Sequence, residues 1–272
     1  MTTRLDQVAD AVQASFSLSG ELLAVAEAMD AQYLLRRSLS DPNVDAAQRQ
    51  QMAETLLGPS LSPAANSLLD AAVGESWPNP EAIAWALRDQ AIVQAWRAAI
   101  SNGTVEQVRQ QVLSVLTVVT TDPAVEIALG DASRDADARR MLAGSLVPGA
   151  GEALQLFVRT AVDDSRASFA LNLDRCLDTL AALRGHQRAR VTTAVALNQN
   201  QTNELVSQLS RIYGAPIDLE PVVDATVIGG VRVDAGGDVI DGSIKARLDA
   251  AREAMAAVTV VAGTASEDGQ HA

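Results

Sequence analysis

The stretch from Gly229 to Ser243 holds five glycines and three aspartates in fifteen residues. Both residue types can serve chemistry, because glycine-rich loops cradle phosphates and clustered aspartates hold metal ions. The stretch has neither the G-x-x-x-x-G-K-[ST] spacing of a phosphate loop nor the G-x-G-x-x-G dinucleotide fingerprint. Its spacing favours the turns of a small sheet, with phosphate binding as the weaker alternative.

Each part of this motif has a predicted backbone role. The second glycine pair separates two alternating segments, where a hairpin turn needs positive φ. The first pair opens a strand and allows a bulge or a close backbone approach. The final Asp-Gly-Ser leads into a predicted helix, where the Asp or the Ser is expected as N-cap. The structural residues of the motif are Gly229, Gly230, Gly236, Gly237, Asp241, Gly242 and Ser243.

A second acidic cluster, Asp131, Ser133, Asp135 and Asp137, resembles half of a calcium-binding loop. An EF-hand needs Gly at position six and Glu at position twelve, but the sequence has Ala and Leu there. A similar cluster begins at Asp41, again before a predicted helix. Two helix starts explain both clusters better than a metal does.

The remaining reactive side chains do not form a recognisable constellation. Cys176 lies in a helical pattern, where a core role is favoured over a reactive thiol. His186 and His271 have no familiar zinc spacing to it. The pair Asp163-Asp164 follows a predicted helix and is interpreted as a solvated turn rather than a catalytic dyad. We therefore predict a non-enzyme with no catalytic residue, metal or cofactor.

Composition limits the partners. The formal net charge is −13, from 21 basic and 34 acidic residues, so nucleic acid and direct adsorption to anionic lipid are disfavoured. Aromatic residues make up only 3%, so the core must consist mainly of Ala, Leu and Val, as in closely packed helices. No signal peptide or membrane span is recognisable, because the longest apolar runs are far short of roughly 20 residues. We expect a cytosolic chain without its own anchor.

The predicted secondary structure around these residues changes near Arg188, from helices to alternating strands and helices. From Arg4 to about Leu183 the apolar spacing is helical, with Pro and Gly breakers at short intervals. Beyond it, alternating segments predict strands at 189–197, 216–224, 228–235 and 238–241, and helices at 200–214 and 242–258. The fold class is α+β. The predicted domains are an all-α bundle at 1–187, an α+β domain at 188–258 and a disordered tail at 259–272.

The helical part contains an internal duplication. The segment from Leu39 aligns with the segment from Leu129 at an offset of 90 residues, with seven identities in nineteen positions; composition alone would give about two. We predict two copies of one helical module, at about 4–100 and 82–187, which share a helix at 80–100.

Apolar stripes on these helices are candidate grooves for a partner helix. One stripe comprises Leu5, Val8 and Val12, and the shared helix offers Leu87 and Ile92. On the same helix, Trp85 and Trp96 lie eleven residues apart and are interpreted as core or interface anchors rather than a ligand cage.

The C-terminal motif also resembles a known family. Val223-Asp224, Gly229-Gly230, the turn glycine Gly236 and the run from Val239 to Ser243, followed by Lys245, Arg247 and Leu248, resemble the C-terminal domain of the delta subunit of F-type ATP synthases. That family includes the mitochondrial oligomycin-sensitivity-conferring subunit. The second helical copy is similar in length to the usual family bundle, and the first is an addition that resembles the longer actinobacterial form.

The resemblance implies a stator without catalytic activity. Its helical domain would hold the N-terminal segments of the alpha subunits, and residues 188–258 would hold the C-termini of the b subunits. The chain would lie at the cytoplasmic face of the plasma membrane and reach it only through the complex. The alternative is a helical-repeat adaptor unrelated to ATP synthase.

Overall fold

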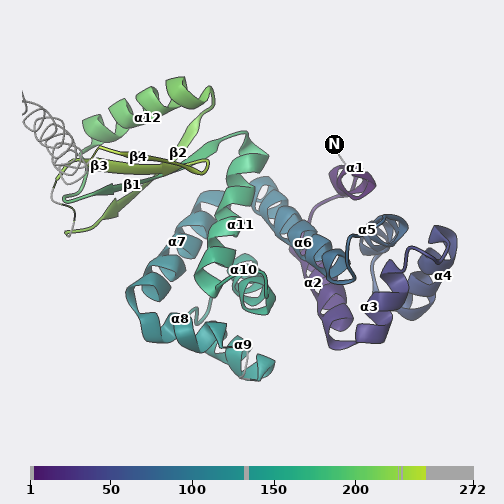
Figure 1. Cartoon of the computed structure of the whole chain (residues 1–272). Coiled ribbons are helices and arrows are strands. Elements are labelled where there is room, and N and C mark those ends of the chain that lie inside the picture. The colour runs from purple at the N-terminus through teal and green to yellow at the C-terminus, as the bar shows by residue number, and fades with distance from the viewer. Residues whose placement is uncertain (1–2, 132–134, 226, 228, 243–272) are drawn as a thin grey trace, which may run out of the picture. The chain divides into compact units, whose positions relative to one another are not determined.

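The computed structural model describes residues 3–131, 135–225, 227 and 229–242. The predicted last helix, with Ser243, and the predicted tail lie outside the described residues. The chain divides into two compact units, Met1–Leu180 and Ala181–Ala272. We call them unit 1 and unit 2 and describe each by itself (Figure 1).

Helices follow one another up to residue 184. They are α1 (Arg4–Ala11), α2 (Phe16–Ala31), α3 (Tyr33–Ser40), α4 (Ala46–Leu56), the short 3-10 helix η1 (Gly58–Ser60), α5 (Pro63–Gly74), α6 (Glu81–Ser101), α7 (Val105–Thr121), α8 (Pro123–Gly130), α9 (Ala136–Ser145), α10 (Glu152–Asp163) and α11 (Phe169–Arg184). Local sequence sets their starts. Ser15 accepts a hydrogen bond from the backbone N–H of Leu18, and Ser62 caps α5 directly before Pro63.

The helices of unit 1 repeat one arrangement, so the predicted helical bundle with an internal duplication is confirmed. Together with the sheet described below, it gives the predicted α+β fold class. Helices α3 and α8 have the same length and begin 90 residues apart, and α5 and α10 match at 89 residues. The packing also repeats: α2 and α4 both contact α5, as α7 and α9 both contact α10. We call α1 to α5 with the first half of α6 the first copy. The second half of α6 with α7 to α11 is the second copy.

Helix α6 belongs to both copies. Its first half contributes Ile83, Ala84, Leu87 and Ala91 to the core of the first copy. In its second half, Trp96 packs on Phe157 with ring centroids 4.4 Å apart, and its indole N–H donates to the Cys176 carbonyl at 2.7 Å. Trp85 is half-buried beneath the guanidinium of Arg166, 5.9 Å from its ring centroid. Both tryptophans are anchors, as predicted.

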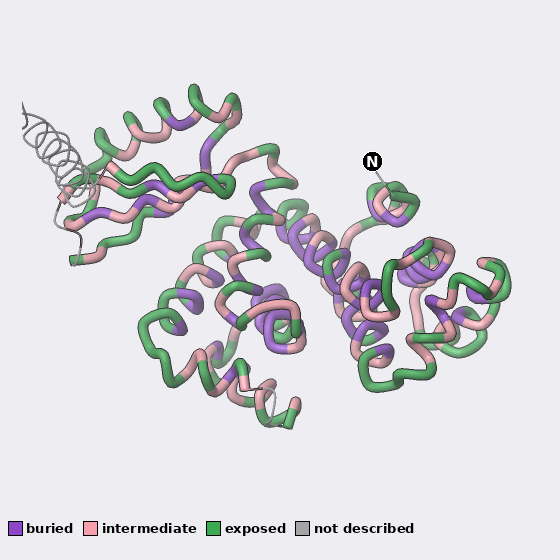
Figure 2. The backbone as a smooth tube through the Cα atoms, viewed as in Figure 1, coloured by how far each residue is buried: buried purple, intermediate pink, exposed green. Residues whose placement is uncertain are grey.

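The core of unit 1 is built from small and branched aliphatic side chains, as the composition predicts. Figure 2 shows buried positions concentrated along α2, α5, α6 and α10. Alanines such as Ala26, Ala72 and Ala99 are fully buried there. Because an Ala carries so little bulk, neighbouring helix backbones can approach closely.

Unit 2 is a four-stranded mixed sheet with one described helix. Its elements are β1 (Gln187–Thr193), α12 (Gln199–Tyr213), β2 (Ile217–Val223), β3 (Val231–Ala235) and β4 (Asp238–Asp241), in the sheet order β2-β1-β3-β4. β1 pairs with β2 in parallel and with β3 antiparallel. Helix α12 begins at a capping box formed by Asn198 and Gln201 and ends at Gly214, with φ 66°. It covers one face of the sheet (Figure 1) and buries Leu209 against Val191 and Val233.

Candidate partner-binding surfaces

The glycine-rich motif forms the β3–β4 hairpin. Ala235 pairs with Asp238, so Gly236 and Gly237 form a two-residue turn, with φ of 60° and 89°. A Cβ on Gly236 would lie 2.8 Å from Nε2 of Gln187. Positive φ therefore favours glycine at both positions, and Gly236 is also closely approached by the Gln187 side chain, so the turn prediction is confirmed.

The first glycine pair has a related role. Gly229 and Gly230 have φ of 90° and 88° directly before β3. At the far end of the hairpin, the Gly242 N–H donates to the Val231 carbonyl at 2.9 Å, so the chain leaving β4 is tied to the start of β3. The N-cap role expected of Asp241 concerns a helix outside the described residues.

The lone thiol is a core group. Cys176 is fully buried, and burial raises the pKa of its thiol well above the ordinary range, so the core interpretation is confirmed. In unit 2, Nδ1 of His186 lies 2.8 Å from Oδ1 of Asp218. His271 lies outside the described residues. Where the chain is described, no group of three His, Cys, Asp or Glu side chains is placed to hold a metal ion.

The acidic clusters that resemble calcium loops shape helix starts. Asp135 accepts a hydrogen bond from the Ala138 N–H at 3.3 Å and caps α9, as predicted. In the first copy Asp45 occupies the same position without a side-chain cap bond. There the Asn43 N–H donates to the Asp41 carboxylate at 2.9 Å, and this bond lowers the Asp41 pKa. Ser133 lies outside the described residues.

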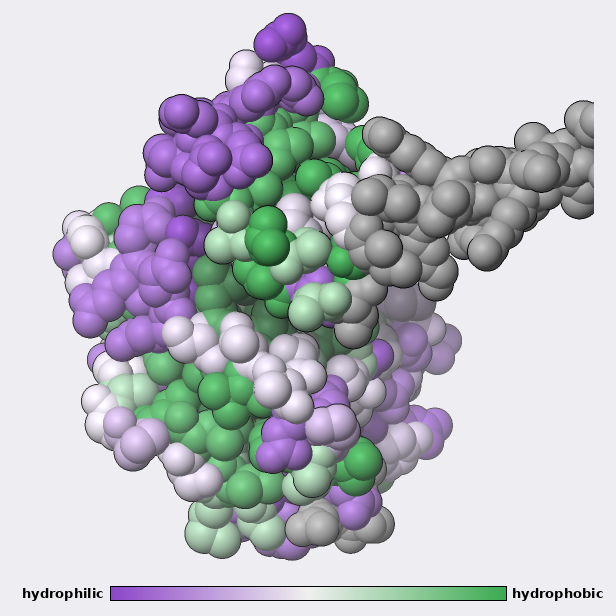
Figure 3. Space-filling model, turned by 90° about the vertical axis from the view of Figure 1, so that its left-hand side faces the viewer, coloured by the Kyte–Doolittle hydropathy of each residue, from purple (hydrophilic) through white to green (hydrophobic). Residues whose placement is uncertain are grey.

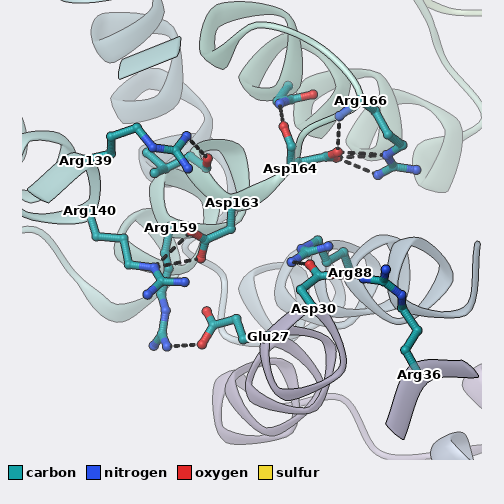
Figure 4. Close-up of polar contacts among 12 residues, drawn as sticks. Glu27, Asp30, Arg36, Arg88, Arg139, Arg140, Arg159, Asp163, Asp164 and Arg166 are labelled. Atoms are coloured by element: carbon teal, nitrogen blue, oxygen red, sulfur yellow. Dashed lines mark hydrogen bonds and ion pairs between the residues drawn. The ribbon is translucent and has the colours of Figure 1, made fainter. Parts of the chain in front are cut away.

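The interpretation of Asp163-Asp164 as a solvated turn is wrong, because both carboxylates are 4% exposed. Arg140 donates its Nε–H to Asp163 at 2.9 Å, and Arg166 binds Asp164 through two nitrogens at 2.6 and 2.9 Å (Figure 4). Burial raises the pKa of Asp163, and nearby Glu27 adds to this shift. Burial acts in the same direction on Asp164, but the hydrogen bonds from Arg166 outweigh it and lower that pKa.

The predicted partner-binding residues divide into two groups. Leu5, Leu87 and Ile92 are at most 6% exposed, and the first two belong to the core of the first copy. Val8 and Val12 are half-buried and lie at the edge of that core. Partner binding by these five residues stays a prediction, with Val8 and Val12 as the members that offer surface.

The two copies meet where α2 packs on α6 and α10. Leu156 of α10 packs against the core of the first copy, 3.9 Å from the position that a Cβ on Gly20 would occupy. Beside it, Arg159 forms an ion pair with Glu27 of α2 (Figure 4). A helix of the first copy thus lies on the α6–α10 side of the second copy.

The equivalent side of the first copy has a different surface. We define the α1–α5 surface as Arg4, Val8, Val12, Ser67 and Asp70. Ser67 stands where the second copy has Leu156 and is exposed, and Asp70 stands where it has Arg159. The Asp70 carboxylate lies 3.7 Å from Arg4, with both side chains about half exposed. This surface therefore stays accessible in unit 1 as described.

Sequence reasoning did not single out Leu156, Arg159 or Glu27. The signal was present in the alignment of the copies, because Leu156 replaces a serine and lies off the buried stripe of α10. That stripe comprises Ala153, Leu154, Phe157, Val158 and Ala161. An apolar residue off the stripe indicates a second contact surface, but its partner is 136 positions away along the chain, at Gly20.

One further pair of helices is unusually apolar. Within the described residues no single helix has the length and apolar composition needed to cross a membrane. Helices α7 and α8 reach that length and composition only together, and the chain bends by 101° between them.

Comparison with known proteins gives consistent matches. The family model described as "ATP synthase delta (OSCP) subunit" matches residues 94–255, beginning in the second half of α6. "ATP synthase subunit delta" of Cutibacterium acnes is 34% identical, covering 93% of this chain and 96% of the relative. The proteins of the same name from Corynebacterium jeikeium and Streptomyces avermitilis are 31% and 32% identical, each match covering 93% of this chain and at least 93% of the relative.

Proposed function

Because this chain belongs to the ATP synthase delta (OSCP) subunit family, we propose that its two units hold two different partners within the synthase. The chain itself is a non-catalytic subunit of the peripheral stalk of a proton-translocating F-type ATP synthase. The stalk is the stator that resists rotation of the catalytic head during ATP synthesis. The comparisons give no support to an adaptor unrelated to ATP synthase.

For unit 1 we propose the N-terminal segment of an alpha subunit, bound as an amphipathic helix on the α1–α5 surface. The observation that carries this is internal to the chain. In the second copy the equivalent α6–α10 side already accepts a helix, α2, through Leu156 and Arg159. A surface of the same origin in the first copy is suited to the same kind of ligand.

For unit 2 we propose the C-terminal segment of the b subunits, with residues 188–258 as the binding region. Two features support this. Unit 2 has its own core, so it can act as a separate binding module. Apolar side chains are also exposed there, such as Ile212 on α12 and Val195 in the segment before it. We also propose that the assembled complex places the chain at the cytoplasmic face of the plasma membrane.

The test uses two variants of the full-length chain, each of which should weaken the binding of only one of the two peptides. Alpha N-terminal and b C-terminal peptides are titrated by calorimetry into the parent chain and two variants. Val8→Asp places a charge on the α1–α5 surface and should weaken the alpha peptide at least tenfold while leaving the b peptide unchanged. Leu56→Asp, at an exposed position on α4, is the matched control and should change neither.

The second variant, Gly236→Val, targets unit 2. It places a side chain at positive φ against Gln187 and should destabilise unit 2 by about 1–3 kcal/mol. We expect weaker b binding and unchanged alpha binding. The opposite pattern in the two variants would reverse the assignment, and failure of both peptides to bind the folded parent chain would refute it.

A further inference from the structure

Helix α7 presents an uncharged stripe to solvent. No charged residue occurs between Arg109 and Asp122, although 20% of the chain is charged. The buried side of α7 is formed by Val108, Val112, Val115, Leu116 and Val119. The opposite side carries the residues that we call the α7 stripe: Gln110, Leu113, Ser114, Thr117, Val118 and Thr121. Their spacing of three and four residues places them on one face.

The hydroxyl groups on this side of the helix do not depend on water for a hydrogen bond. Ser114, Thr117 and Thr121 donate to the backbone carbonyls four residues earlier, at 2.9, 2.9 and 2.7 Å. Covering a hydroxyl that is already bonded leaves no unsatisfied donor. Val118 is 52% exposed and Leu113 half-buried. The α7 stripe can therefore be buried at a much lower desolvation penalty than a charged helix face.

Figure 3 views the molecule from the side on which α7 and α8 lie in Figure 1. Apolar and weakly polar side chains form a broad area in the lower part of this view. On the helix that follows α7, Ile127 of α8 is a further exposed apolar side chain of unit 1, 71% exposed.

The first copy indicates what kind of ligand covers such a stripe. The α2 positions equivalent to Gln110, Leu113 and Thr117 are Gly20, Leu23 and Glu27, and α10 packs over them. Leu23, which lies between Gly20 and Glu27 in sequence, is 1% exposed, whereas Leu113 is half-buried. Among the described helices of unit 1, none takes the place on α7 that α10 takes on α2.

We propose that the α7 stripe binds an amphipathic α-helix of another synthase subunit, through a contact face that is apolar and uncharged. The proposal rests on the function proposed above. The packing of α10 on α2 is the template for a helical occupant, and the exchange of Glu27 for Thr117 removes the need for a basic partner residue. Another molecule of the same protein is disfavoured as occupant, because each molecule carries a net charge of −13.

Thiol accessibility tests the proposal. Val118→Cys introduces a thiol on the stripe, while the native Cys176 is buried and its raised pKa suppresses its reaction. The matched control is Met141→Cys on α9, at a position 71% exposed. Maleimide labelling rates of this subunit are compared in the isolated chain, in the purified synthase and with lipid vesicles alone. We expect labelling at position 118 to slow at least tenfold in the synthase only, and labelling at position 141 to change less than twofold.

The outcomes separate this proposal from the function. If the chain assembles and position 118 labels as fast as in isolation, the stripe is free and the inference fails while the stator function stands. Slow labelling in the isolated chain, or protection by vesicles alone, would identify unit 2 or lipid as the occupant and would also overturn it. A photoreactive maleimide at position 118 should cross-link to a helical segment of another subunit, and Thr117→Glu should weaken retention in the synthase about tenfold.

Discussion

In the first helical copy, Oε1 of Glu75 accepts a hydrogen bond from the Leu5 N–H at 2.9 Å, and so satisfies a free backbone donor at the start of α1. Its counterpart in the second copy, Asp164, binds Arg166 instead. The reason lies in the helix that each copy starts from. Helix α1 has an N-terminus of its own, whereas the equivalent helix is the second half of α6 and has no free N–H groups to cap.

A buried arginine shows the same divergence. Arg49 is 4% exposed and donates to the carbonyls of Asp41, Val44, Val73 and Glu75, at 2.8 to 3.1 Å. Its counterpart Arg139 donates to the Leu129 and Val162 carbonyls at 3.5 and 3.2 Å. The two copies keep the residue and the helix end that it holds, but Arg49 is buried whereas Arg139 is half-buried. Both arginines therefore donate to backbone carbonyls, but we expect their contributions to the free energy of unfolding to differ with how deeply each is buried.

The largest expected effect tests whether Arg49 contributes more to the free energy of unfolding than Arg139. Arg49→Met should lower the free energy of unfolding by about 3 kcal/mol, because it leaves several buried carbonyls without a donor. Arg139→Met should lower it by about 1 kcal/mol. Urea denaturation monitored by far-UV circular dichroism measures both. Equal losses in the two variants would mean that the copies use this arginine in the same way.

An intermediate effect is expected where the copies touch. Leu156→Ser gives the second copy the residue of the first and should lower the free energy of unfolding by about 1–2 kcal/mol, because a packed apolar side chain is lost. The reverse exchange, Ser67→Leu, adds an apolar side chain to an exposed position and should change it by no more than about 0.5 kcal/mol. The same thermal or urea unfolding assay serves for both. A larger loss in Ser67→Leu than in Leu156→Ser would contradict the view that only the second copy's site is occupied.

The smallest effect is the pH dependence that Asp163 and Asp164 add to the second copy, at the positions where the first copy has Gly74 and Glu75. The pKa of Asp163 is raised above 3.8, so the folded state holds this proton more tightly and gains stability as pH falls from the raised pKa towards 3.8. The pKa of Asp164 is lowered, so its contribution is complete above 3.8 and is lost as pH falls through the folded pKa.

The two asparagine variants separate these contributions. Unfolding free energies measured from pH 2.5 to 6 should show that Asp163→Asn changes the slope above pH 3.8, and that Asp164→Asn flattens it below. Glu75→Gln is the control from the first copy. A slope change above pH 3.8 in Asp164→Asn instead would reverse the two assignments.

Local features of the fold were predictable because their causes lie close together in sequence. The hairpin at Gly236-Gly237 and the end of α12 at Gly214 follow from residues that tolerate positive φ, and the cap at Asp135 follows from a side chain beside its own helix. The duplication was predictable from the alignment of residue types. It also accounts for the start of the family match inside α6.

The binding surfaces were harder to predict, because helical periodicity does not say what covers a stripe. Leu5 and Leu87 have the spacing of a groove, yet they fill the core of the first copy. Asp163 is buried by Arg140, 23 residues earlier in the chain, and by Glu27, 136 residues away. The uncharged run on α7 was visible as an apolar segment, but its meaning depends on hydroxyl bonds within the helix and on the packing of α10 over α2.

The shared helix α6 also constrains how the gene can change. Its 21 residues form a rod of about 31 Å, and each residue turns the chain by about 100°. One residue inserted between Ala91 and Trp96 would swing the second copy around the axis of α6 and separate Leu156 and Arg159 from α2. Length variation among descendants of this duplication is therefore expected in the loops and not in α6. The number of residues in α6 sets the rotation of the second copy relative to the first.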